Sequence, residues 1–185
     1  RTVPVPVTLS GRRTVHNLLV NSADAKGLSS RLRDFSDEHG VDIALQPRAA
    51  RCQSYRLAVF DMDSTLIDCE VIDELAAQAG VGQAVAEITA RAMRGELDFD
   101  ESYRTRLALL EGLDARAVDE LADRLPVKEG LREMTTTLKA RGMTLAIFSG
   151  GFMPIAERLR ADFGFDEVVA NTLEIEHGKV TGRVV

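Results

Sequence analysis

Apolar residues follow two different spacings along the chain, and these spacings separate predicted strands from predicted helices. Three short continuous apolar runs, at 57–60, 144–148 and 168–170, are typical of strands buried in a parallel sheet. Between them, apolar residues recur every three or four positions, as they do along 71–79, which is the spacing of an amphipathic helix. Strands and helices that alternate in this way predict an α/β fold built on a doubly wound parallel sheet.

The stretch between the first two predicted strands, at about residues 70–126, has helical spacing almost throughout. Gly95 is expected to end the second of its helices. Either Asp98 or Asp100 could cap the third helix, and Gly112 would end it. Downstream of this stretch we expect two helices and a β-hairpin, at 130–141, 154–163 and 173–180.

A smaller arrangement is expected before residue 55. The predicted elements there are a strand, a helix and a second strand, at 14–21, 28–39 and 41–45. Gly40 would end the helix as a capping glycine. Residues 46–54, with Pro47 and several polar or basic residues, are expected to be a linker. The chain is thus predicted to hold a small α/β segment at 1–54 and a larger domain at 55–185.

The 185 residues carry a net charge of −6, and this charge is unevenly distributed. Residues 1–55 hold 8 Lys and Arg against 5 Asp and Glu, a net +3, whereas residues 56–185 hold 15 against 24, a net −9. The negative charge argues against nucleic acid as a partner, and the chain has no apolar run long enough to cross a membrane. Cys52 and Cys69 form no C-x-x-C pair and no disulfide framework, which favours a reducing cytoplasm.

The first apolar run of the larger domain ends in two acids one residue apart, Asp61 and Asp63, followed by two hydroxyl residues. Acids at the carboxyl end of a buried strand lie where open α/β sheets bind their ligands. Two carboxylates so close together repel each other, so a bound cation or a proton on one of them must compensate. An ordinary polar turn is the alternative. A calcium-binding loop is excluded, because Leu66 and Ile72 replace its turn glycine and its bidentate glutamate.

The sequence around these acids resembles the first motif, D-x-D-x-T, of the haloacid dehalogenase superfamily of phosphatases. The longer match, from Asp61 through Glu70, is similar to the phosphoserine phosphatase family. The resemblance implies that Asp61 attacks phosphorus and forms an aspartyl phosphate, while Asp63 serves as general acid and then as general base. It also implies that Mg²⁺ is bound by the Asp61 carboxylate and the Asp63 backbone carbonyl. Such a cation would let an acidic domain attract a phosphate, and the inserted helices would form a cap that closes over the site.

The second apolar run ends in Ser149-Gly150-Gly151, which resembles the second motif of the same superfamily. The resemblance implies that the Ser149 hydroxyl and the Gly150 backbone bind phosphate, since glycines allow a close approach of backbone N–H donors ahead of a helix. Taken alone, Ser-Gly-Gly is a common turn. Asn171 also falls on a family pattern, but no role can be assigned to it.

Four residues of the helical stretch match positions that contact substrate in the family. The resemblance implies that Glu70 meets the substrate amino group and that Arg106 grips its carboxylate through two parallel hydrogen bonds. Phe99 and Met93 would supply apolar walls. Arg104 competes with Arg106 for its role, and the spacing from Phe99 favours Arg106. The alternatives are a first-turn helix acid for Glu70, a solvated charge for the arginine, and core packing for the two apolar residues.

Two further motifs of the family, a phosphate-binding lysine and an acidic metal-binding loop, are expected after Val185. Lys179 does not fit the lysine, because it lies in the predicted hairpin turn. The chain starts at Arg1 without Met and ends where a strand is expected to begin, so it could be a fragment of a longer polypeptide. Residues 1–185 alone are then expected to show little or no phosphatase activity and to bind Mg²⁺ weakly.

The resemblance therefore implies a Mg²⁺-dependent phosphatase that hydrolyses O-phosphoserine to serine and phosphate, the last step of serine biosynthesis. Glu70 together with Arg106 favours an amino-acid substrate, because only an amino acid needs both an anionic and a cationic partner. Another small phosphomonoester remains an alternative substrate. A second alternative is an inactive or regulatory protein whose segment 1–54 binds an amino acid. No nucleic-acid or membrane partner is expected, and a homodimer is left open.

Overall fold

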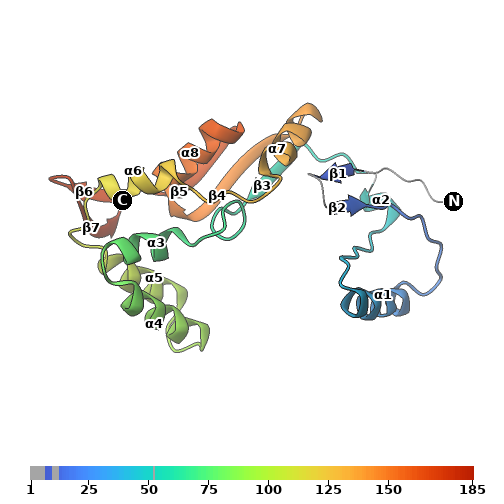
Figure 1. The fold of residues 1–185 in the computed structure, drawn as a ribbon, viewed down its shortest axis with the longest axis horizontal. Helices are drawn as coiled ribbons and strands as arrows, with labels where there is room; N and C mark the ends of the chain where they lie inside the picture. The colour runs from blue at the N-terminus through green and yellow to red at the C-terminus, as the bar shows by residue number, and fades with distance from the viewer. Residues whose placement is uncertain (1–6, 10–12, 52) are drawn as a thin grey trace. The chain divides into compact units, whose positions relative to one another are not determined.

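The structure is a computed structural model, and it describes residues 7–9, 13–51 and 53–185. The chain divides into two compact units, 1–54 and 55–185 (Figure 1). Cys69 is a free thiol in the second unit, whereas Cys52 lies outside the described residues.

The first unit contains one long helix and several short elements. These are β1 (Val7–Leu9), β2 (Arg13–Val15), α1 (Ala25–His39) and α2 (Arg48–Arg51). β1 and β2 pair antiparallel. Asp24 caps α1 by accepting a hydrogen bond of 2.9 Å from the Gly27 N–H, so the helix begins at Ala25, before its predicted start at residue 28. Gly40 ends it in a left-handed conformation, as the sequence predicted. No residue of α1 is buried in the described chain, so its apolar face remains accessible.

Two strands predicted in this unit are wrong. The strand at 14–21 is limited to the last residues of β2, and the strand at 41–45 is absent. The predicted linker also contains the short helix α2. A strand is stabilised by hydrogen bonds to a neighbouring strand. Residues 14 and 15 pair with β1, but 16–21 and 41–45 have no such partner among the described residues. Leu18 and Ile43 therefore remain exposed despite their apolar character.

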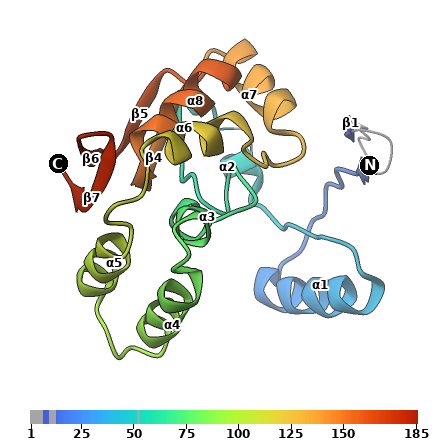
Figure 2. The same ribbon diagram turned by 60° about the vertical axis from the view of Figure 1, so that its left-hand side comes forward.

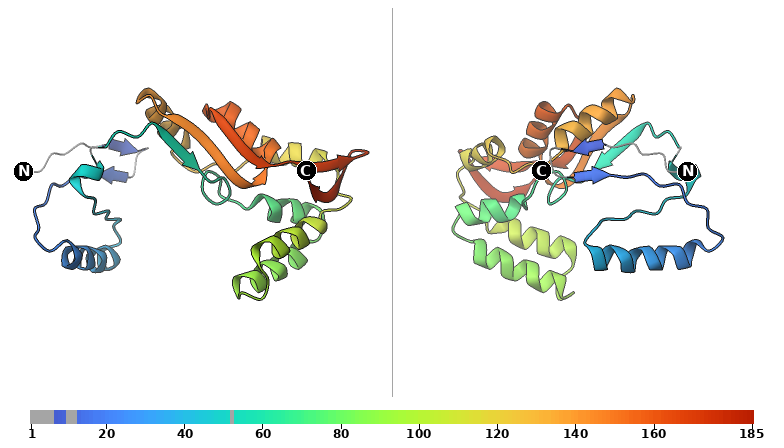
Figure 3. Two further views of the ribbon diagram at one scale, coloured as in Figure 1. Left: turned by 180° about the vertical axis from the view of Figure 1, so that it is seen from behind. Right: turned by 45° about the vertical axis from the view of Figure 1, so that its right-hand side comes forward.

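The second unit is built on a parallel sheet of three strands, β3 (Leu57–Phe60), β4 (Thr144–Phe152) and β5 (Glu167–Asn171). The three apolar runs predicted these strands and their parallel pairing. In the structure they lie side by side in chain order (Figure 3). Phe60 is paired with Ile147, and this register brings the strand ends that carry Asp61 and Ser149 next to each other. β4 continues beyond its predicted end at residue 148 through an irregularity in its pairing with β5.

Helices pack against one face of this sheet. They are α6 (Arg116–Asp123), α7 (Leu131–Ala140) and α8 (Met153–Phe163). α7 and α8 contact β4, and α6 lies on α8 (Figure 2). Leu145 and Ile147 of β4 are fully buried on this side. The opposite face exposes the large apolar side chains Leu57, Val59, Phe148 and Val169.

Three helices that follow β3 form a cap beside the sheet. They are α3 (Val71–Gln78), α4 (Gly82–Met93) and α5 (Phe99–Ala108). Asp98, rather than Asp100, caps α5 by accepting a hydrogen bond of 2.7 Å from the Glu101 N–H. α6 contacts both α3 and α8, so the predicted insertion at about 70–126 reaches from the cap into the core.

The two segments that join the cap to the core run beside each other. Residues 66–68 and 126–128, here called the double linker, are held by an antiparallel bridge between Ile67 and Val127. Backbone hydrogen bonds of 2.7 Å and 3.0 Å join the same two segments on either side of that bridge. The entry to the cap and the exit from it are therefore tied together.

The last two strands, β6 (Leu173–Glu176) and β7 (Lys179–Val184), form the predicted β-hairpin. The hairpin supports the end of the cap, because the Gly112 N–H donates a hydrogen bond of 2.8 Å to the Val180 carbonyl. Among the described helices, none has the length and apolar character that a membrane crossing requires.

Candidate active site

Asp61 and Asp63 follow β3 directly, and the residue between them explains their spacing. Met62 is fully buried, and its carbonyl accepts a hydrogen bond of 2.8 Å from the Leu66 N–H as the chain turns. Successive side chains of a strand point to opposite sides. Burial of Met62 at the strand end therefore directs both carboxyl groups away from the core, toward the same side.

The turn after the acids closes back on the start of α3. Ser64 has a φ of 54°, which is uncommon for a residue other than glycine. Its amide donates to the Cys69 carbonyl at 3.1 Å, and its hydroxyl donates to Glu70 Oε1 at 2.7 Å. These contacts hold Glu70 close enough to Asp63 for their charges to interact.

The end of β4 lies against these acids. The Gly151 N–H donates a hydrogen bond of 2.9 Å to Ser149 Oγ. A methyl group at position 151 would lie 2.4 Å from Met62 Cε and 3.1 Å from Asp63 Oδ2, so a side chain there would displace its neighbours. Glycine at this position is what allows the Ser149 turn to approach the carboxyl groups.

The two acids have different environments. The pKa of Asp63 is raised to about 7, first by burial, then by the charge of Glu70 and less by that of Asp61, against a backbone hydrogen bond from Val71. In the described chain, Asp63 Oδ1 is buried without a hydrogen-bond partner. Asp61 is exposed, and its Oδ1 accepts a hydrogen bond of 2.7 Å from the Met62 N–H. One carboxyl group can hold a proton near neutral pH, while the other is accessible from the pocket.

The cap contributes one face of α5. Phe99, Tyr103 and Arg106 are spaced four and three residues apart, so they lie on the same side of the helix. The Phe99 and Tyr103 rings are stacked, with their centroids 6.2 Å apart. Arg106 is half-buried, and its Nε donates to the Ser102 carbonyl at a long 3.4 Å. This face presents aromatic surface, a hydroxyl group and a cation.

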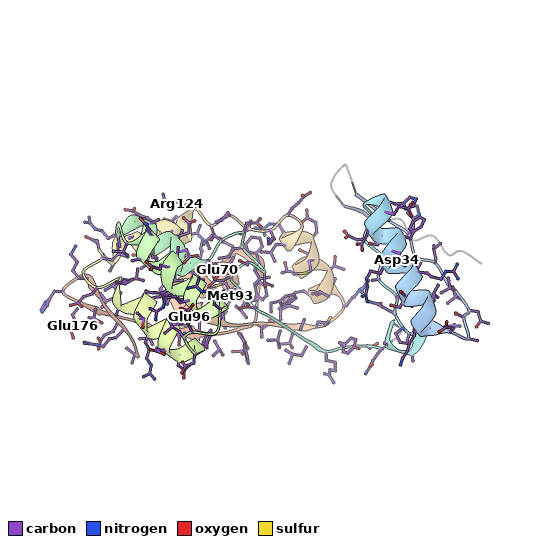
Figure 4. The ribbon with its side chains drawn as sticks, turned by 90° about the horizontal axis from the view of Figure 1, so that it is seen from below. Asp34, Glu70, Met93, Glu96, Arg124 and Glu176 are labelled. Atoms are coloured by element: carbon purple, nitrogen blue, oxygen red, sulfur yellow. The ribbon has the colours of Figure 1, made fainter. Side chains whose placement is uncertain are left out.

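Core and cap face each other across a pocket of about 230 Å³. Seven of the eight predicted site residues line it, namely Asp61, Asp63, Glu70, Phe99, Arg106, Ser149 and Gly150. Met93, at the end of α4, is 85% exposed and does not line the pocket; it is labelled with Glu70 in Figure 4. Arg104 is exposed as well and lies outside the lining. The structure brings the core acids and the α5 cation together but leaves Met93 apart.

A second pocket, of about 350 Å³, lies between α6, the start of α8 and β6. Its lining is mostly apolar, with Val118, Met153 and Leu173 among the contributing side chains. Asp119 and Glu157 also line it, but they belong to α6 and α8 and not to the strand ends that carry the predicted motifs, so this pocket is not the candidate for the predicted chemistry.

The residues of the first pocket fit part of a cation site. Asp61 and Asp63 supply the oxygen donors that Mg²⁺ prefers. The unpaired Asp63 Oδ1 and the nearby Glu70 charge also favour a positive partner at this place. Within the residues that the structure describes, however, no cluster of three or more His, Cys, Asp or Glu side chains is placed to hold a metal.

Sequence reasoning missed several residues of the pocket. Tyr103 lines it together with Phe99 and Arg106, and its position one helical turn from each of them was a usable signal. Gly151, which the sequence identified only as part of the Ser-Gly-Gly motif, lines the pocket as well, and the contact that a side chain there would make with Met62 joins residues far apart in the sequence. Such contacts appear only once the chain is folded.

Residues 55–185 match the family model for haloacid dehalogenase-like hydrolases. The chain belongs to this family, and the superfamily resemblance of its motifs is confirmed. The predicted α/β fold is confirmed as well. A haloacid dehalogenase family hydrolase from Salmonella enterica serovar Typhi superposes with a TM-score of 0.81 at 31% identity, over 88% of this chain and 55% of that one.

The similar proteins include phosphoserine phosphatases. The phosphoserine phosphatase of Archaeoglobus fulgidus is 44% identical over 161 residues, which are 87% of this chain and 47% of the relative. A solved structure described as a phospho-aspartyl intermediate analogue of phosphoserine phosphatase is 40% identical, with a TM-score of 0.65, over 71% of this chain and 63% of that one. The chain spans less than half the length of the first curated relatives that it matches, between 39% and 47%.

Proposed function

We propose that residues 55–185 belong to a Mg²⁺-dependent phosphatase that hydrolyses O-phosphoserine to serine and inorganic phosphate. The observation that carries this proposal is a pair of strand-end carboxyl groups in unlike environments, Asp61 and Asp63, which share one pocket with the cap residue Arg106. Relatives named phosphoserine phosphatase support the substrate.

In the first step, an Asp61 oxygen attacks phosphorus, and an aspartyl phosphate forms as the bond from phosphorus to the serine oxygen breaks. Asp63 donates its proton to that leaving oxygen. A pKa of about 7 leaves much of Asp63 protonated at neutral pH, which an ordinary aspartate would not be.

In the second step, water attacks the phosphorus of the aspartyl phosphate. Asp63, now ionised, takes the proton of that water, and the bond between phosphorus and Asp61 breaks to release inorganic phosphate. Asp63 recovers its proton in this way, and Asp61 its carboxylate. The relative described as a phospho-aspartyl intermediate analogue supports the same kind of intermediate here.

The phosphate itself would be held by the end of β4. Ser149 Oγ accepts a hydrogen bond from the Gly151 N–H, so its own proton is available to a phosphoryl oxygen. α8 begins directly after this turn, and its N-terminus favours an anion. Mg²⁺ held by Asp61 and Asp63, together with ligands that the described residues do not supply, would neutralise part of the phosphoryl charge.

The cap would select the amino-acid part of the substrate. Arg106 lines the pocket from α5 and can form two parallel hydrogen bonds with a carboxylate. Glu70 lines it from the start of α3 and can accept hydrogen bonds from an ammonium group. Only a substrate with both groups would use both residues, which favours phosphoserine over a simple phosphomonoester.

The test uses the complete protein that contains this chain. Release of inorganic phosphate is measured with O-phosphoserine, O-phosphothreonine and p-nitrophenyl phosphate, each with and without Mg²⁺. We expect Mg²⁺-dependent turnover, with kcat/KM highest for O-phosphoserine by at least about tenfold over p-nitrophenyl phosphate, since the latter lacks both recognised groups. Equal efficiencies would support another phosphomonoester as the substrate, and no release from any of the three would reject the phosphatase.

Other properties rest on the resemblance and stay predictions. They include a homodimer, a cytoplasmic location and binding of an amino acid by unit 1–54. The similarity to the Archaeoglobus fulgidus enzyme covers 161 residues, more than unit 55–185 contains, so it reaches into unit 1–54. This extent favours a shared role for the first unit without naming its ligand.

A further inference from the structure

One hydrogen-bonded side chain connects the cap to the phosphate-binding turn. Asn171 stands at the end of β5, and its Nδ2 group donates two hydrogen bonds. One, of 3.0 Å, goes to the Tyr103 hydroxyl oxygen on α5. The other, of 2.8 Å, goes to the Gly150 carbonyl oxygen. The two N–H bonds of one planar amide thus join the cap to the end of β4.

The second of these hydrogen bonds fixes more than a carbonyl group. The carbonyl of Gly150 and the N–H of Gly151 belong to one planar trans peptide, so they point in opposite directions. With the carbonyl held by Asn171, the N–H is directed to Ser149 Oγ, which it reaches at 2.9 Å. Because Oγ is thereby occupied as an acceptor, the Ser149 proton is left to point toward a ligand.

The first hydrogen bond makes this arrangement depend on the cap. Tyr103 is half-buried, lines the same pocket and stacks on Phe99. Its hydroxyl group can meet Asn171 only while α5 lies close to the end of β5. A cap that moves away would remove one of the two acceptors that orient the Asn171 amide.

We propose that Asn171 is a positioning residue that couples the placement of α5, through Tyr103, to the orientation of the Ser149 hydroxyl through the peptide between Gly150 and Gly151. The inference rests on the proposed function only where it takes the ligand of Ser149 to be a phosphoryl group. Asn171 itself does not line the pocket, so it acts on the ligand through the turn.

Three variants test the separate contacts of this path, which runs from Tyr103 through Asn171 to the peptide between Gly150 and Gly151 and is here called the relay. Tyr103→Phe removes the cap acceptor and keeps the stacked ring. Asn171→Ala removes both hydrogen bonds. Asn171→Asp can still accept from the Tyr103 hydroxyl but can no longer donate to the Gly150 carbonyl. Thr105→Val is the control, because the Thr105 hydroxyl on the same helix bonds only its own helix carbonyl, that of Glu101, in the described chain.

The first measurement is the competitive inhibition constant of inorganic phosphate against turnover in the complete protein. Loss of a neutral hydrogen bond predicts a rise of about three- to tenfold for Asn171→Ala and Asn171→Asp, and a smaller rise for Tyr103→Phe. Combining Tyr103→Phe with Asn171→Ala should add nothing to Asn171→Ala alone, because both interrupt one relay. Thr105→Val should leave the constant unchanged. Effects of the two substitutions that multiply, or an unchanged constant in Asn171→Ala with only a lower melting temperature, would overturn the proposal.

The second measurement needs no activity. Hydrogen exchange of the Gly151 amide, followed by NMR, should be about three- to tenfold faster in Asn171→Ala than in the wild-type protein and unaffected by Thr105→Val. If the wild-type protein does not hydrolyse O-phosphoserine, the proposed function fails, and this exchange still decides the relay. Unchanged protection of Gly151 in Asn171→Ala would reject the relay even in an active enzyme.

Discussion

The core wall and the cap wall of the pocket are built in different ways. The core wall consists of strand ends: Met62 is buried beneath it, and Gly151 leaves no room for a side chain. The cap wall is one face of a helix whose side chains are more open, and Phe99 is 71% exposed. Close packing fixes the reacting groups, whereas the cap groups depend on where α5 lies. Under the proposed function, this difference would give chemistry to the core and selectivity to the cap, a division that the following experiments test.

The largest effect is expected from Asp61→Asn in the complete protein. An amide is a poor nucleophile, so turnover of every phosphomonoester should fall to background, by about ten-thousandfold or more. Phosphate release is measured first, and brief incubation with labelled substrate should then place label on Asp61 in the wild-type protein only. Label on Ser64 or Ser149 instead would contradict the assignment of the nucleophile.

Asp63→Asn should come next, with a loss of about a hundred- to a thousandfold, because the leaving oxygen would no longer receive a proton. The loss should shrink for p-nitrophenyl phosphate, whose leaving group needs little protonation. Measuring kcat/KM for both substrates distinguishes these outcomes, because kcat/KM reports the first step alone, whereas the second step is common to both substrates. Equal losses in kcat/KM would show that Asp63 serves phosphate or metal binding in that step rather than proton transfer to the leaving oxygen.

On the cap wall, Arg106→Ala should lower kcat/KM for O-phosphoserine by about ten- to a hundredfold, since a charge-assisted contact contributes about 1.5–3 kcal/mol. p-Nitrophenyl phosphate never makes that contact, so its efficiency should change little. Arg104→Ala is the matched control, because Arg104 lies outside the pocket lining. Equal losses for both substrates would break the division, since Arg106 would then support the phosphate or the fold of the cap.

The smallest effect concerns stability and the electrostatic strain of the core wall. The folded pKa of Asp63, about 7, lies above its ordinary value of 3.8, so between these values the folded protein binds a proton that the unfolded chain lacks. The contribution of Asp63 to the free energy of unfolding is therefore fully present below about pH 4 and is lost as the pH rises through the folded pKa of about 7.

The side chain of Asp63→Asn cannot titrate. As the pH rises from 5 to 8, the melting temperature of the wild-type protein should therefore fall by about 3 °C relative to that of the variant. This figure allows for the solvent-exposed part of the carboxyl group. Thermal melts in chelator-containing buffer give the two curves. If the difference in melting temperature between the two proteins does not vary with pH, the folded state does not raise the pKa of Asp63.

Local patterns carried most of the prediction. The runs at 57–60 and 144–148 are strands because their apolar side chains fill a sheet, and Asp98 and Gly40 mark helix ends through short-range hydrogen bonds. The failure at 41–45 has the opposite cause. An apolar run becomes a strand only beside a partner, and partners are set by the fold rather than by the run itself.

In the candidate site, too, local patterns predicted some residues, whereas others depend on contacts that only the fold creates. Asp61 and Asp63 are neighbours in sequence, so their pairing was visible without the fold. Met93 was expected from the family pattern, yet the structure places it on an exposed helix end. Asn171 and Tyr103 are 68 positions apart, and the hydrogen bond between them follows from packing α5 against the end of β5. No local pattern encodes such a contact.

The double linker sets how the cap can move. Two independent tethers would let the cap slide, twist or tilt, but tethers bonded to each other at Ile67 and Val127 act as one hinge axis. A rotation of the cap about that axis would also have to carry or open the contact of its far end with the hairpin, where the Gly112 N–H donates to the Val180 carbonyl. Arg106 and Tyr103, on the same face of α5, must arrive at the pocket in step. A ligand too large for the pocket would stop the cap before it closes fully, and the Tyr103 hydroxyl would then not reach Asn171.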